Sequence, residues 1–447
     1  MIKERLFGTD GIRGVANQHP MTAEVALRVG RAVGYIFQKE DRPYTILIGK
    51  DTRISGYMIE NALTAGLCSM GCHVLLVGPL PTPGVSYIMR SLRCDAAIMI
   101  SASHNEYHYN GIKFFGSDGY KIADEVEDEI QRLVQNGELD NVGPIAERVG
   151  TARRIDDAVG RYVEFAKSSF PKGMRLDGLR IVCDCANGAS YKVGPYTLSE
   201  LGAEVIPIHN QPNGRNINAE CGSVYPDDMR ATVIKERADL GLCFDGDGDR
   251  LVMSDEEGRL LDGNAILSML AVDLLERDAM PKKMLATTIM ANGGLHRAIA
   301  PYGGSVVWTK VGDRYVVEAM REHGLVLGGE SSGHLVMLEH NVTGDALIAC
   351  LQVLAALIRH DQPLSALGAA YRPMPEAHAK VPVNGAKPSD EKIAALSQEA
   401  EDDLKGAGRV VIRASGTEPI IRVMVQHDTQ RVADELVKVL ADRVAKL

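Results

Sequence analysis

Long hydrophobic runs and an excess of positive charge are both missing from this sequence. The first ten residues contain no apolar segment of the kind found in signal peptides. The most apolar helix candidate, residues 346–358, is shorter than the ~20 residues that a membrane span needs. Lys and Arg number 49 against 59 Asp and Glu, and the formal net charge of −10 disfavours binding to nucleic acid. We therefore expect a soluble cytoplasmic protein with no membrane or nucleic-acid partner.

Cysteine and aromatic residues are also scarce, with 8 Cys and a single Trp. Two closely spaced pairs occur, Cys68 with Cys72 and Cys183 with Cys185. No matching second pair follows either of them, so we expect reduced thiols packed in the core rather than metal ligands. Glycine, in contrast, is abundant at 45 residues without a Gly-X-Y period, which indicates many tight turns and ligand loops.

Short apolar runs alternate with segments of helical spacing over most of the chain, a pattern typical of α/β layers with largely parallel strands. The pattern occurs three times. Strands are predicted at Thr45–Gly49, His73–Val77, Asp95–Ser101, Leu179–Asp184, Glu204–Ile208, Ala238–Phe244, Met284–Thr288, Ser305–Thr309 and Leu325–Gly328, with a helix at Tyr57–Met70.

The last part of the chain has a different pattern. Strands are predicted at Ala377–Val383, Arg409–Ala414 and Ile420–Gln426, and helices at Glu391–Leu404 and Arg431–Lys446, which together make a small α+β unit. The predicted fold is three α/β domains with mixed, largely parallel sheets and a C-terminal α+β domain around one central cleft. We expect four domains at residues 1–150, 151–254, 255–368 and 369–447, with linkers at residues 136–150, rich in polar and turn residues, and 361–375, which contains prolines.

The segment Asp245-Gly246-Asp247-Gly248-Asp249 carries the strongest chemical signal and follows a predicted strand. Three carboxylates at alternate positions repel one another unless a cation lies among them, and the glycines allow the backbone to bend so that they converge. Oxygen ligands of this kind suit Mg²⁺. A calcium loop of the EF-hand type is disfavoured, because Arg250 occupies the place where that loop needs glycine. A solvated acidic turn is the remaining alternative.

The segment Ser101-Ala102-Ser103-His104-Asn105 follows another buried strand, at the end where open α/β sheets usually bind ligands. Its small residues leave a hydroxyl available for covalent chemistry, although a plain polar turn explains the same residues. A phosphate on Ser103 would supply the metal ligand that the aspartates lack.

Two further loops offer groups for a sugar phosphate. Gly329-Glu330-Ser331-Ser332-Gly333-His334 provides a carboxylate, hydroxyls and an imidazole that titrates near neutral pH, or is a surface loop. Arg413-Ala414-Ser415-Gly416-Thr417, with Arg422 close behind, provides two guanidinium groups and a turn suited to holding phosphate, or is a structural turn.

Other signals are weaker than these four motifs. Phe7–Gly14 and Gly49–Arg53 are glycine-rich turns that carry cations, or are structural, and residues 310–314 follow a predicted strand and are able to approach the same cleft. No recognisable constellation is formed by His19, His73, His209 and Cys221, which we expect to be surface or core residues.

These four motifs, in this order, resemble those of the α-D-phosphohexomutase superfamily, whose members place a phosphoserine loop, a metal loop, a sugar loop and a phosphate loop around one cleft. The opening segment Phe7–Gly14, the stretch Gly49–Met58 and the paired serines Ser101 and Ser103 are similar to the branch that acts on glucosamine phosphates. The resemblance implies interconversion of glucosamine-6-phosphate and glucosamine-1-phosphate through a bound 1,6-bisphosphate, for UDP-N-acetylglucosamine and peptidoglycan synthesis. Mannose or glucose phosphates are the alternative substrates.

The resemblance also implies roles for individual residues. Ser103 carries the phosphoryl group and completes a site for one Mg²⁺ with Asp245, Asp247 and Asp249. Lys113 and His334 are expected to transfer protons. A glucosamine or glucose 1,6-bisphosphate primes the enzyme, and a homodimer is expected. The residues expected to bind substrate are Arg13, Arg250, Glu330, Ser332, Arg413, Ser415, Gly416, Thr417 and Arg422.

Three positions depart from the usual family pattern. Glu106 stands where most relatives have proline, Tyr109 where Asp is usual, and Ser331 where Gln or Asn is common in amino-sugar enzymes.

A sugar-phosphate sensor without turnover and an Mg²⁺-dependent phosphatase are the other function classes. The retained Ser103, Lys113 and His334 argue against the sensor, and the second phosphate-binding loop argues against the phosphatase.

Overall fold

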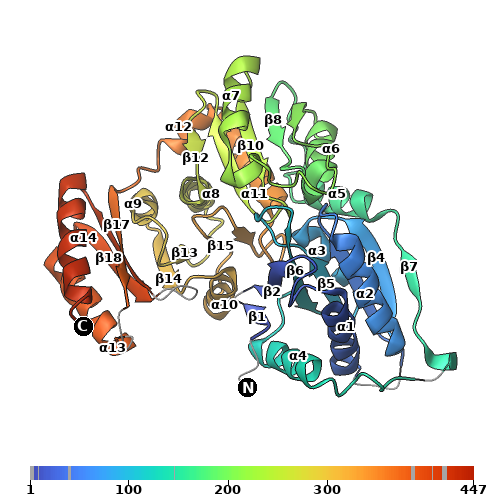
Figure 1. Ribbon diagram of the computed structural model, residues 1–447. Coiled ribbons are helices and arrows are strands. Elements are labelled where there is room, and N and C mark those ends of the chain that lie inside the picture. Colours follow the sequence, from blue (N-terminus) through green and yellow to red (C-terminus); the bar gives the residue numbers. More distant parts are fainter. Residues whose placement is uncertain are drawn as a thin grey trace.

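The computed structural model describes residues 5–8, 10–38, 42–144, 146–383, 388–404, 406–414 and 420–447. Its strands form four sheets, one for each of four units that follow one another along an arc (Figure 1). In that view the blue first unit lies at the right, the green second unit above, the yellow third unit in the middle and the red fourth unit at the left.

The first unit is built on a seven-stranded sheet in the order β1-β2-β6-β5-β3-β4-β7. The strands β5, β3, β4 and β7 are neighbours in that order and pair in parallel. The strands β1, β2, β6 and β5 are neighbours in that order and pair antiparallel. The strands are β1 (Phe7–Gly8), β2 (Gly11–Val15), β3 (Thr45–Lys50), β4 (His73–Pro79), β5 (Ala96–Ile100), β6 (Tyr109–Gly116) and β7 (Ala152–Arg154), and the helices are α1 (Ala23–Phe37), α2 (Gly56–Ser69), α3 (Thr82–Ser91) and α4 (Asp124–Asn136).

The second unit has five strands in the order β12-β11-β10-β8-β9, with β8 parallel to both β9 and β10. The strands are β8 (Arg180–Asp184), β9 (Glu204–Ile208), β10 (Leu240–Phe244), β11 (Leu251–Asp255) and β12 (Leu260–Leu261), and the helices are α5 (Ala158–Ser168), α6 (Val193–Glu200) and α7 (Asp227–Glu236).

The third unit has four strands in the order β14-β13-β15-β16, again with parallel pairs on both sides of the first strand, β13. The strands are β13 (Met284–Thr288), β14 (Ser305–Thr309), β15 (Leu327–Gly329) and β16 (Leu335–Met337), and the helices are α8 (Gly263–Glu276), α9 (Gly294–Ile299), α10 (Asp313–His323), α11 (Ala346–His360) and α12 (Leu364–Gly368).

The fourth unit is an antiparallel sheet in the order β17-β19-β18 covered by two helices. Its elements are β17 (Glu376–Pro382), β18 (Gly408–Ala414), β19 (Ile420–His427), α13 (Asp390–Leu404) and α14 (Gln430–Val444). The three α/β units with mixed sheets and the final α+β unit confirm the predicted fold class, and every strand predicted from the sequence is present within two residues of its expected ends.

Two strands lie across predicted boundaries. β7 pairs with β4 although it follows residue 150, and β12 pairs with β11 although it follows residue 254. We propose that the first and second units extend to these strands.

One strand order recurs in the first three units. In each unit the chain forms two parallel strands, then a third strand parallel to the first, and then a fourth strand that pairs antiparallel with the third. The resulting orders in the sheet are β6-β5-β3-β4, β11-β10-β8-β9 and β16-β15-β13-β14. The loop between the third and fourth of these strands therefore begins at the carboxyl end of a parallel strand in every unit, which is where α/β sheets bind ligands.

Helix α11 explains the most apolar segment of the sequence. Every residue from Ala346 to Leu357 is buried, because the helix packs within a hydrophobic core that includes Tyr162, Leu242 and Leu270 and joins the first three units. In the part of the chain that the structure describes, no helix has both the length and the apolar character to cross a membrane.

The cysteines are also packed as expected. None of the eight forms a disulfide, and Cys72, Cys183 and Cys185 are buried in apolar surroundings while Cys68 is half-buried.

Candidate active site

The three loops that occupy the same place in the first three units carry most of the predicted site residues. Ser103 lies between β5 and β6, the Asp245–Asp249 loop between β10 and β11, and Glu330, Ser332 and His334 between β15 and β16. The second and third of these loops are also in direct backbone contact, because Arg250 and His334 form an antiparallel bridge and Leu251 N–H donates to Gly333 O. The fold thus brings three predicted motifs to one region.

Ser103 is buried and points at the loop of residues 245–249, which is called the metal loop below. Its hydroxyl donates a hydrogen bond to Asp245 Oδ2 at 2.6 Å, and its backbone N–H donates to Ser101 Oγ at 2.9 Å. The backbone of Ser103 has φ of +50°, in the left-handed region that residues other than glycine rarely adopt. The contact between Ser103 and Asp245 joins the first unit to the second.

The three aspartates of the metal loop converge as the sequence predicted. Ligand oxygens of Asp245, Asp247 and Asp249 lie within 4.8 Å of one another, and all three residues are buried. Burial, followed by the charges of Asp249 and Asp247, raises the pKa of the Asp245 carboxyl well above its ordinary value. A divalent cation would remove this cost, since it stabilises the ionised form of each carboxylate.

Two oxygens in this cluster fit a cation directly. Asp247 Oδ1 and Asp249 Oδ1 are buried and have no hydrogen-bond partner among the described residues, whereas Asp247 Oδ2 accepts from Thr82 Oγ1 at 2.7 Å. Buried carboxylate oxygens without partners are costly in a folded protein. Hard oxygen donors at this spacing match the preference of Mg²⁺, so the residues present fit the predicted metal.

Lys113 lies on β6 among the carboxylates. Its Nζ is 2.9 Å from Asp247 Oδ2, 3.2 Å from Asp10 Oδ2 and 3.7 Å from Asp249 Oδ2. Burial lowers its pKa, but the charges of Asp10, Asp247 and Asp249 outweigh burial and raise the pKa above the ordinary value for lysine. The same contacts lower the pKa of Asp247, although burial acts in the opposite direction. Lys113 is therefore protonated at neutral pH in this arrangement. Because a raised pKa also makes the ammonium group a weak acid, it is suited to supply a fixed positive charge and not to transfer a proton.

His334 contacts a residue that only a weak sequence signal had marked. Its Nε2 lies 3.6 Å from Asp313 Oδ2, and Asp313 also accepts from Lys121 Nζ at 2.6 Å. Gly344 packs on the imidazole so closely that a Cβ atom there would lie 2.3 Å from Nε2. Asp313 belongs to a segment after β14, residues 310–314, that the sequence marked as able to approach the same site.

Glu330 and Ser332 flank this histidine. Burial, more than any other cause, raises the pKa of the Glu330 carboxyl, and its Oε1 accepts from Gly312 N–H at 3.3 Å. Ser332 Oγ is buried and has no hydrogen-bond partner among the described residues, so it is available to a ligand.

Two predicted arginines lie beside these loops. Arg13, on β2, donates to Asp10, and Arg250 directly follows the three aspartates. Burial lowers the pKa of Arg250, but the charges of Asp249, Asp245 and Glu330 raise it overall. His104 lies next to Ser103, and burial together with the charges of Arg250 and Arg13 lowers its pKa to about 4, so its imidazole is neutral at physiological pH.

The remaining predicted residues belong to the fourth unit. Arg413 and Arg422 are paired across β18 and β19. Strand β18 lies at the left of Figure 1, whereas β6 lies near the middle. Burial, followed by the charge of Arg422, lowers the pKa of Arg413. Ser415, Gly416 and Thr417 lie outside the described residues. The described part of the fourth unit therefore contributes two neighbouring guanidinium groups.

Sequence reasoning did not identify several residues that contact the site. Asp10 was noted only as part of a glycine-rich turn, and no signal marked Thr82, Lys121 or Asn218, because their partners are distant in sequence. Arg53 had been noted only in a turn that carries cations, yet it is fully buried beneath the Ser103 loop.

A second group of polar residues lies at the carboxyl end of β8. Asp184, His209 and Cys221, the last two expected to be unrelated, lie within 4.8 Å of one another. Asp184 accepts backbone N–H groups from Ala186 and Gly222, and His209 lies between Asp184 and Asp228. The hydrogen bond to Asp184 raises the pKa of His209. These contacts provide partners for Asp184 and His209 without a metal.

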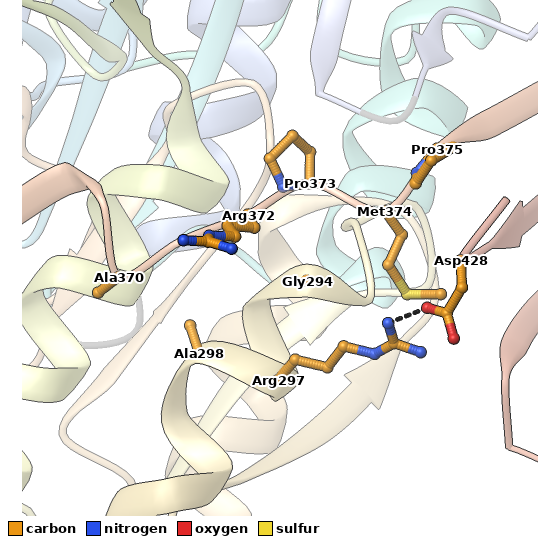
Figure 2. A pocket seen from close by; sticks show the side chains of 9 residues that line it. All are labelled: Gly294, Arg297, Ala298, Ala370, Arg372, Pro373, Met374, Pro375 and Asp428. Atoms are coloured by element: carbon orange, nitrogen blue, oxygen red, sulfur yellow. Dashed lines mark hydrogen bonds and ion pairs between the residues drawn. The ribbon is translucent and has the colours of Figure 1, made fainter. Parts of the chain in front are cut away.

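A hollow of about 350 Å³ lies at the junction of the third and fourth units (Figure 2). Figure 2 shows Arg297, on α9, directed across the hollow to an ion pair with Asp428, beside the linker from Ala370 to Pro375. None of its lining residues is one of the predicted catalytic groups, so we regard it as a feature of the junction.

Four family models match successive parts of the chain. Domains I, II and III of phosphoglucomutase/phosphomannomutase, described as alpha/beta/alpha domains, match residues 4–141, 160–258 and 262–374. The C-terminal domain of the same family matches residues 376–443. Together the matches extend over nearly the whole chain, in the order of the four units.

Similar proteins agree with this assignment. A phosphoglucosamine mutase of Geotalea uraniireducens is 51% identical over 445 residues, covering 99% of this chain and 98% of the relative. A crystal structure of a phosphoglucomutase/phosphomannomutase family protein from Burkholderia thailandensis has a TM-score of 0.81 at 24% identity, covering 100% of this chain and 98% of that one.

More distant structures include ligands. N-acetylphosphoglucosamine mutase of Aspergillus fumigatus, solved with GlcNAc-6P and magnesium, has a TM-score of 0.65 at 19% identity, covering 99% of this chain and 95% of that one. A variant of that fungal enzyme was solved with glucose 1,6-bisphosphate. The matches to all four domains and the 51% identity over nearly the full length place this chain in the phosphoglucomutase/phosphomannomutase family.

Proposed function

We propose that this chain interconverts glucosamine-6-phosphate and glucosamine-1-phosphate, as a phosphoglucosamine mutase. The relative with that name is 51% identical over 99% of the chain, which favours this substrate over mannose or glucose phosphates. The observation that carries the proposed chemistry is the hydrogen bond from Ser103 Oγ to Asp245 Oδ2, in a buried cluster of three aspartates. A hydroxyl in this position is suited to carry the phosphoryl group.

One Mg²⁺ per chain would be held by Asp245, Asp247 and Asp249, with a phosphate on Ser103 as the further ligand. The bare oxygens of Asp247 and Asp249 support this ligand set, and a fungal neighbour of the same fold was solved with magnesium. The metal would supply positive charge to the phosphoryl oxygens, which is where most of the rate enhancement of phosphoryl transfer arises.

The covalent step moves one phosphoryl group between two oxygens. The bond from phosphorus to Ser103 Oγ breaks as a bond to the free hydroxyl oxygen of the sugar forms, and the hydroxyl proton leaves to a base. The bound 1,6-bisphosphate then returns its other phosphate to Ser103. The bond from that phosphorus to its sugar oxygen breaks as a bond to Ser103 Oγ forms, and the proton taken up by the base goes to the released sugar oxygen. Because Lys113 is held protonated among carboxylates, we assign it to stabilise the charge of the phosphoryl oxygens, in place of the proton transfer expected from the resemblance. His334, beside Asp313, is the proposed proton acceptor.

The sugar and its second phosphate would be held by the remaining predicted residues. Glu330 and Ser332 are proposed to bind sugar hydroxyls, since both belong to the loop that carries His334 and Ser332 Oγ has no hydrogen-bond partner among the described residues. Arg13 and Arg250 would bind the reacting side, and Arg413, Ser415, Gly416, Thr417 and Arg422 the distant phosphate. A central cleft between the four units would exclude water from the phosphoserine.

Several parts of the proposal concern the cellular context. A glucosamine or glucose 1,6-bisphosphate would prime Ser103, and a fungal relative of this fold was solved with glucose 1,6-bisphosphate. We propose a homodimer that acts in the cytoplasm and supplies UDP-N-acetylglucosamine for peptidoglycan synthesis.

The decisive experiment combines intact mass with a mutase assay containing Mg²⁺ and glucose 1,6-bisphosphate. We expect a phosphate on Ser103 and formation of glucosamine-1-phosphate, both lost in Ser103→Ala. Ser117→Ala, at an exposed position after β6, is the matched control and should retain both. Activity in Ser103→Ala, or release of inorganic phosphate as the main product, would contradict the proposed mutase.

The choice of sugar is tested separately. We expect kcat/KM for glucosamine-6-phosphate to exceed that for mannose-6-phosphate and glucose-6-phosphate by at least about tenfold, because a site that hydrogen-bonds an amino group discriminates against sugars lacking it. The reverse order would assign the chain to the neutral-sugar enzymes of the family.

A further inference from the structure

Ser103 adopts a backbone conformation that it would not hold unaided. With φ of +50° it is left-handed, and an L-residue with a Cβ avoids that region unless its surroundings impose it. The same residue must direct its hydroxyl at Asp245. The contacts that impose the backbone conformation of Ser103 therefore also determine where its hydroxyl points.

Arg53 supports the loop from the first unit. Its guanidinium is completely buried and donates to three carbonyl oxygens of the loop, those of Ser103 at 2.9 Å, Asn105 at 2.8 Å and Glu106. Asp51 neutralises it through an ion pair of 2.9 Å and also accepts from Ser101 Oγ at 2.7 Å. The planar fork of arginine suits this grip, since several donors have fixed directions.

Asn218 supports the same loop from the second unit. Its Nδ2 donates to Ser103 O and to Asn105 O, both at 2.9 Å. The side chain is buried, and its backbone N–H is fixed by Ala186 O at 2.9 Å. Two carbonyl oxygens of the loop thus each accept hydrogen bonds from both units.

The metal loop closes the arrangement. A Cβ on Gly246 would lie 2.6 Å from Ser103 O and 2.7 Å from Asn218 Nδ2, so the glycine packs directly on the hydrogen bond between these two atoms. Displacement of the Ser103 carbonyl would therefore displace the loop that holds the aspartates.

We propose that Arg53 and Asn218 are positioning residues that clamp the Ser103 carbonyl and keep the hydroxyl, or its phosphate, in line with the metal loop. Because Asn218 comes from the second unit, the catalytic geometry of Ser103 depends on the contact between the first two units. This inference rests on the proposed phosphoryl transfer through Ser103.

Steady-state kinetics of Asn218→Asp test the inference. The carboxylate has nearly the same shape but presents oxygens to two carbonyl oxygens, so it replaces two hydrogen bonds by repulsion. We expect kcat to fall about 10- to 100-fold, the range for a slightly misplaced reacting group, while KM for glucosamine-6-phosphate changes less than about threefold. Asn213→Asp is the matched control, because Asn213 is exposed in the same segment and its Oδ1 only accepts the Arg215 N–H, which Asp retains.

A second variant guards against misfolding. If Asn218→Asp lowers the melting temperature, the kinetics are measured on Asn218→Ala instead. This variant removes the hydrogen-bond donor without adding a charge. Combination with Arg53→Lys should lower kcat by less than the product of the two single effects, since both residues hold the same oxygens. An unchanged kcat in Asn218→Ala and Asn218→Asp, or a loss confined to KM, would overturn the inference.

The inference and the proposed function fail differently. Inactivity of the wild-type chain and of Asn213→Asp on all three hexose phosphates would contradict the proposed function alone. In that case the rate at which glucose 1,6-bisphosphate phosphorylates Ser103 tests the clamp. We expect that rate to fall at least about tenfold in Asn218→Asp, and an unchanged rate would overturn the clamp.

Discussion

Each aspartate of the metal loop has a different set of partners, although the sequence makes them look equivalent. Asp247 is compensated by Lys113 and Thr82, so its pKa is lowered. Asp245 is hydrogen-bonded to Ser103 and to the backbone N–H groups of Asp249 and Arg250, but burial and two like charges dominate and raise its pKa. Asp245 is therefore a carboxyl whose ionised form is disfavoured in the metal-free protein.

We expect Asp245→Asn to raise the melting temperature of the EDTA-treated protein at neutral pH. The amide keeps an acceptor for the two backbone N–H groups. It also removes a carboxyl group whose ionisation is opposed by burial and by the neighbouring negative charges. The folded wild type holds this proton more tightly than the unfolded chain, so its metal-free stability falls as pH rises above the ordinary range of a carboxyl.

The same variant should lose function. In the wild type, Mg²⁺ should raise the melting temperature and EDTA should reverse the rise. In Asp245→Asn the rise should disappear together with mutase activity. A lower melting temperature of the metal-free variant, or an undiminished response to Mg²⁺, would show that Asp245 is not where the repulsion is concentrated.

Glu127, on α4, provides a test of pH dependence away from the site. Burial, followed by the charge of Asp124, raises its pKa from 4.5 to about 7. Because the folded state binds this proton more tightly, stability from Glu127 is lost as pH rises between about 4.5 and 7. We expect the melting temperature to fall less in Glu127→Gln than in the wild type when the pH is raised from 5 to 7.5. Glu125→Gln, exposed on the same helix, should behave as the wild type.

At the scale of elements, one connection repeated in three units explains why the motifs converge. Each functional loop links a parallel strand to the antiparallel strand beside it, β5 to β6, β10 to β11 and β15 to β16. The sequence predicted the parallel strands well, because they are continuous apolar runs buried on both faces. It also located Ser103 and the three aspartates, because each motif directly follows such a run.

The antiparallel strands were harder to predict. β6 contains Asn110 and Lys113, and β11 ends in Ser254 and Asp255, so neither has the composition of a buried strand. They are nevertheless buried, since Lys113 has carboxylate partners from the second unit and Asp255 accepts from Arg259. Contacts such as those of Asn218 and Thr82 depend on tertiary structure and have no local signal. Sequence therefore predicts the loops but not what holds them.

The close contact of Gly344 with His334 tests the third loop. A methyl group at Gly344 would displace the imidazole, since its Cβ would lie 2.3 Å from Nε2. We expect Gly344→Ala to lower kcat by about 100-fold and to leave the Mg²⁺-dependent rise in melting temperature intact, because the metal loop belongs to the second unit. Gly160→Ala, in α5 with no atom within 4 Å of the new Cβ, should keep full activity. Loss of the Mg²⁺ response in Gly344→Ala would mean that the loops do not act separately.

At the scale of the whole molecule, the fourth unit is distinct from the other three. One hydrophobic core runs through the first three units, whereas the fourth has its own core, which includes Val423, Val437 and Leu440. It is joined to the third unit by the linker from Ala370 to Pro375 and by contacts around the hollow in Figure 2. Whether Arg413 and Arg422 reach a substrate phosphate therefore depends on this junction.

Two contacts at the junction differ in strength. Asn292 is 6% exposed and holds the backbone of Met374 at both ends, with Nδ2 2.9 Å from Met374 O and Oδ1 2.8 Å from Met374 N. The ion pair of Arg297 with Asp428 has side chains 45% and 49% exposed. Exposed ion pairs contribute about 0–1 kcal/mol, whereas a buried donor or acceptor left without its partner costs about 1–3 kcal/mol. Of these two contacts, the buried amide should therefore contribute more to the docking of the fourth unit, beside the hydrogen bonds of Gly293 with Gln426 and of Arg409 with Ala291.

We expect Asn292→Ala to increase hydrogen exchange in β17 and β19 and to raise KM for glucosamine-6-phosphate, because a loosely docked fourth unit presents its arginines less often. Arg297→Ala should change the stability by less than about 0.5 kcal/mol and leave KM within about twofold, since solvent screens the charge that it loses. If instead Arg297→Ala raises hydrogen exchange and KM while Asn292→Ala changes neither, the ion pair drawn in Figure 2 holds the junction. The linker backbone then connects the two units without fixing their docking. If exchange rises in Asn292→Ala while KM stays constant, the fourth unit is mobile without affecting substrate binding, and the phosphate must be held by the first three units.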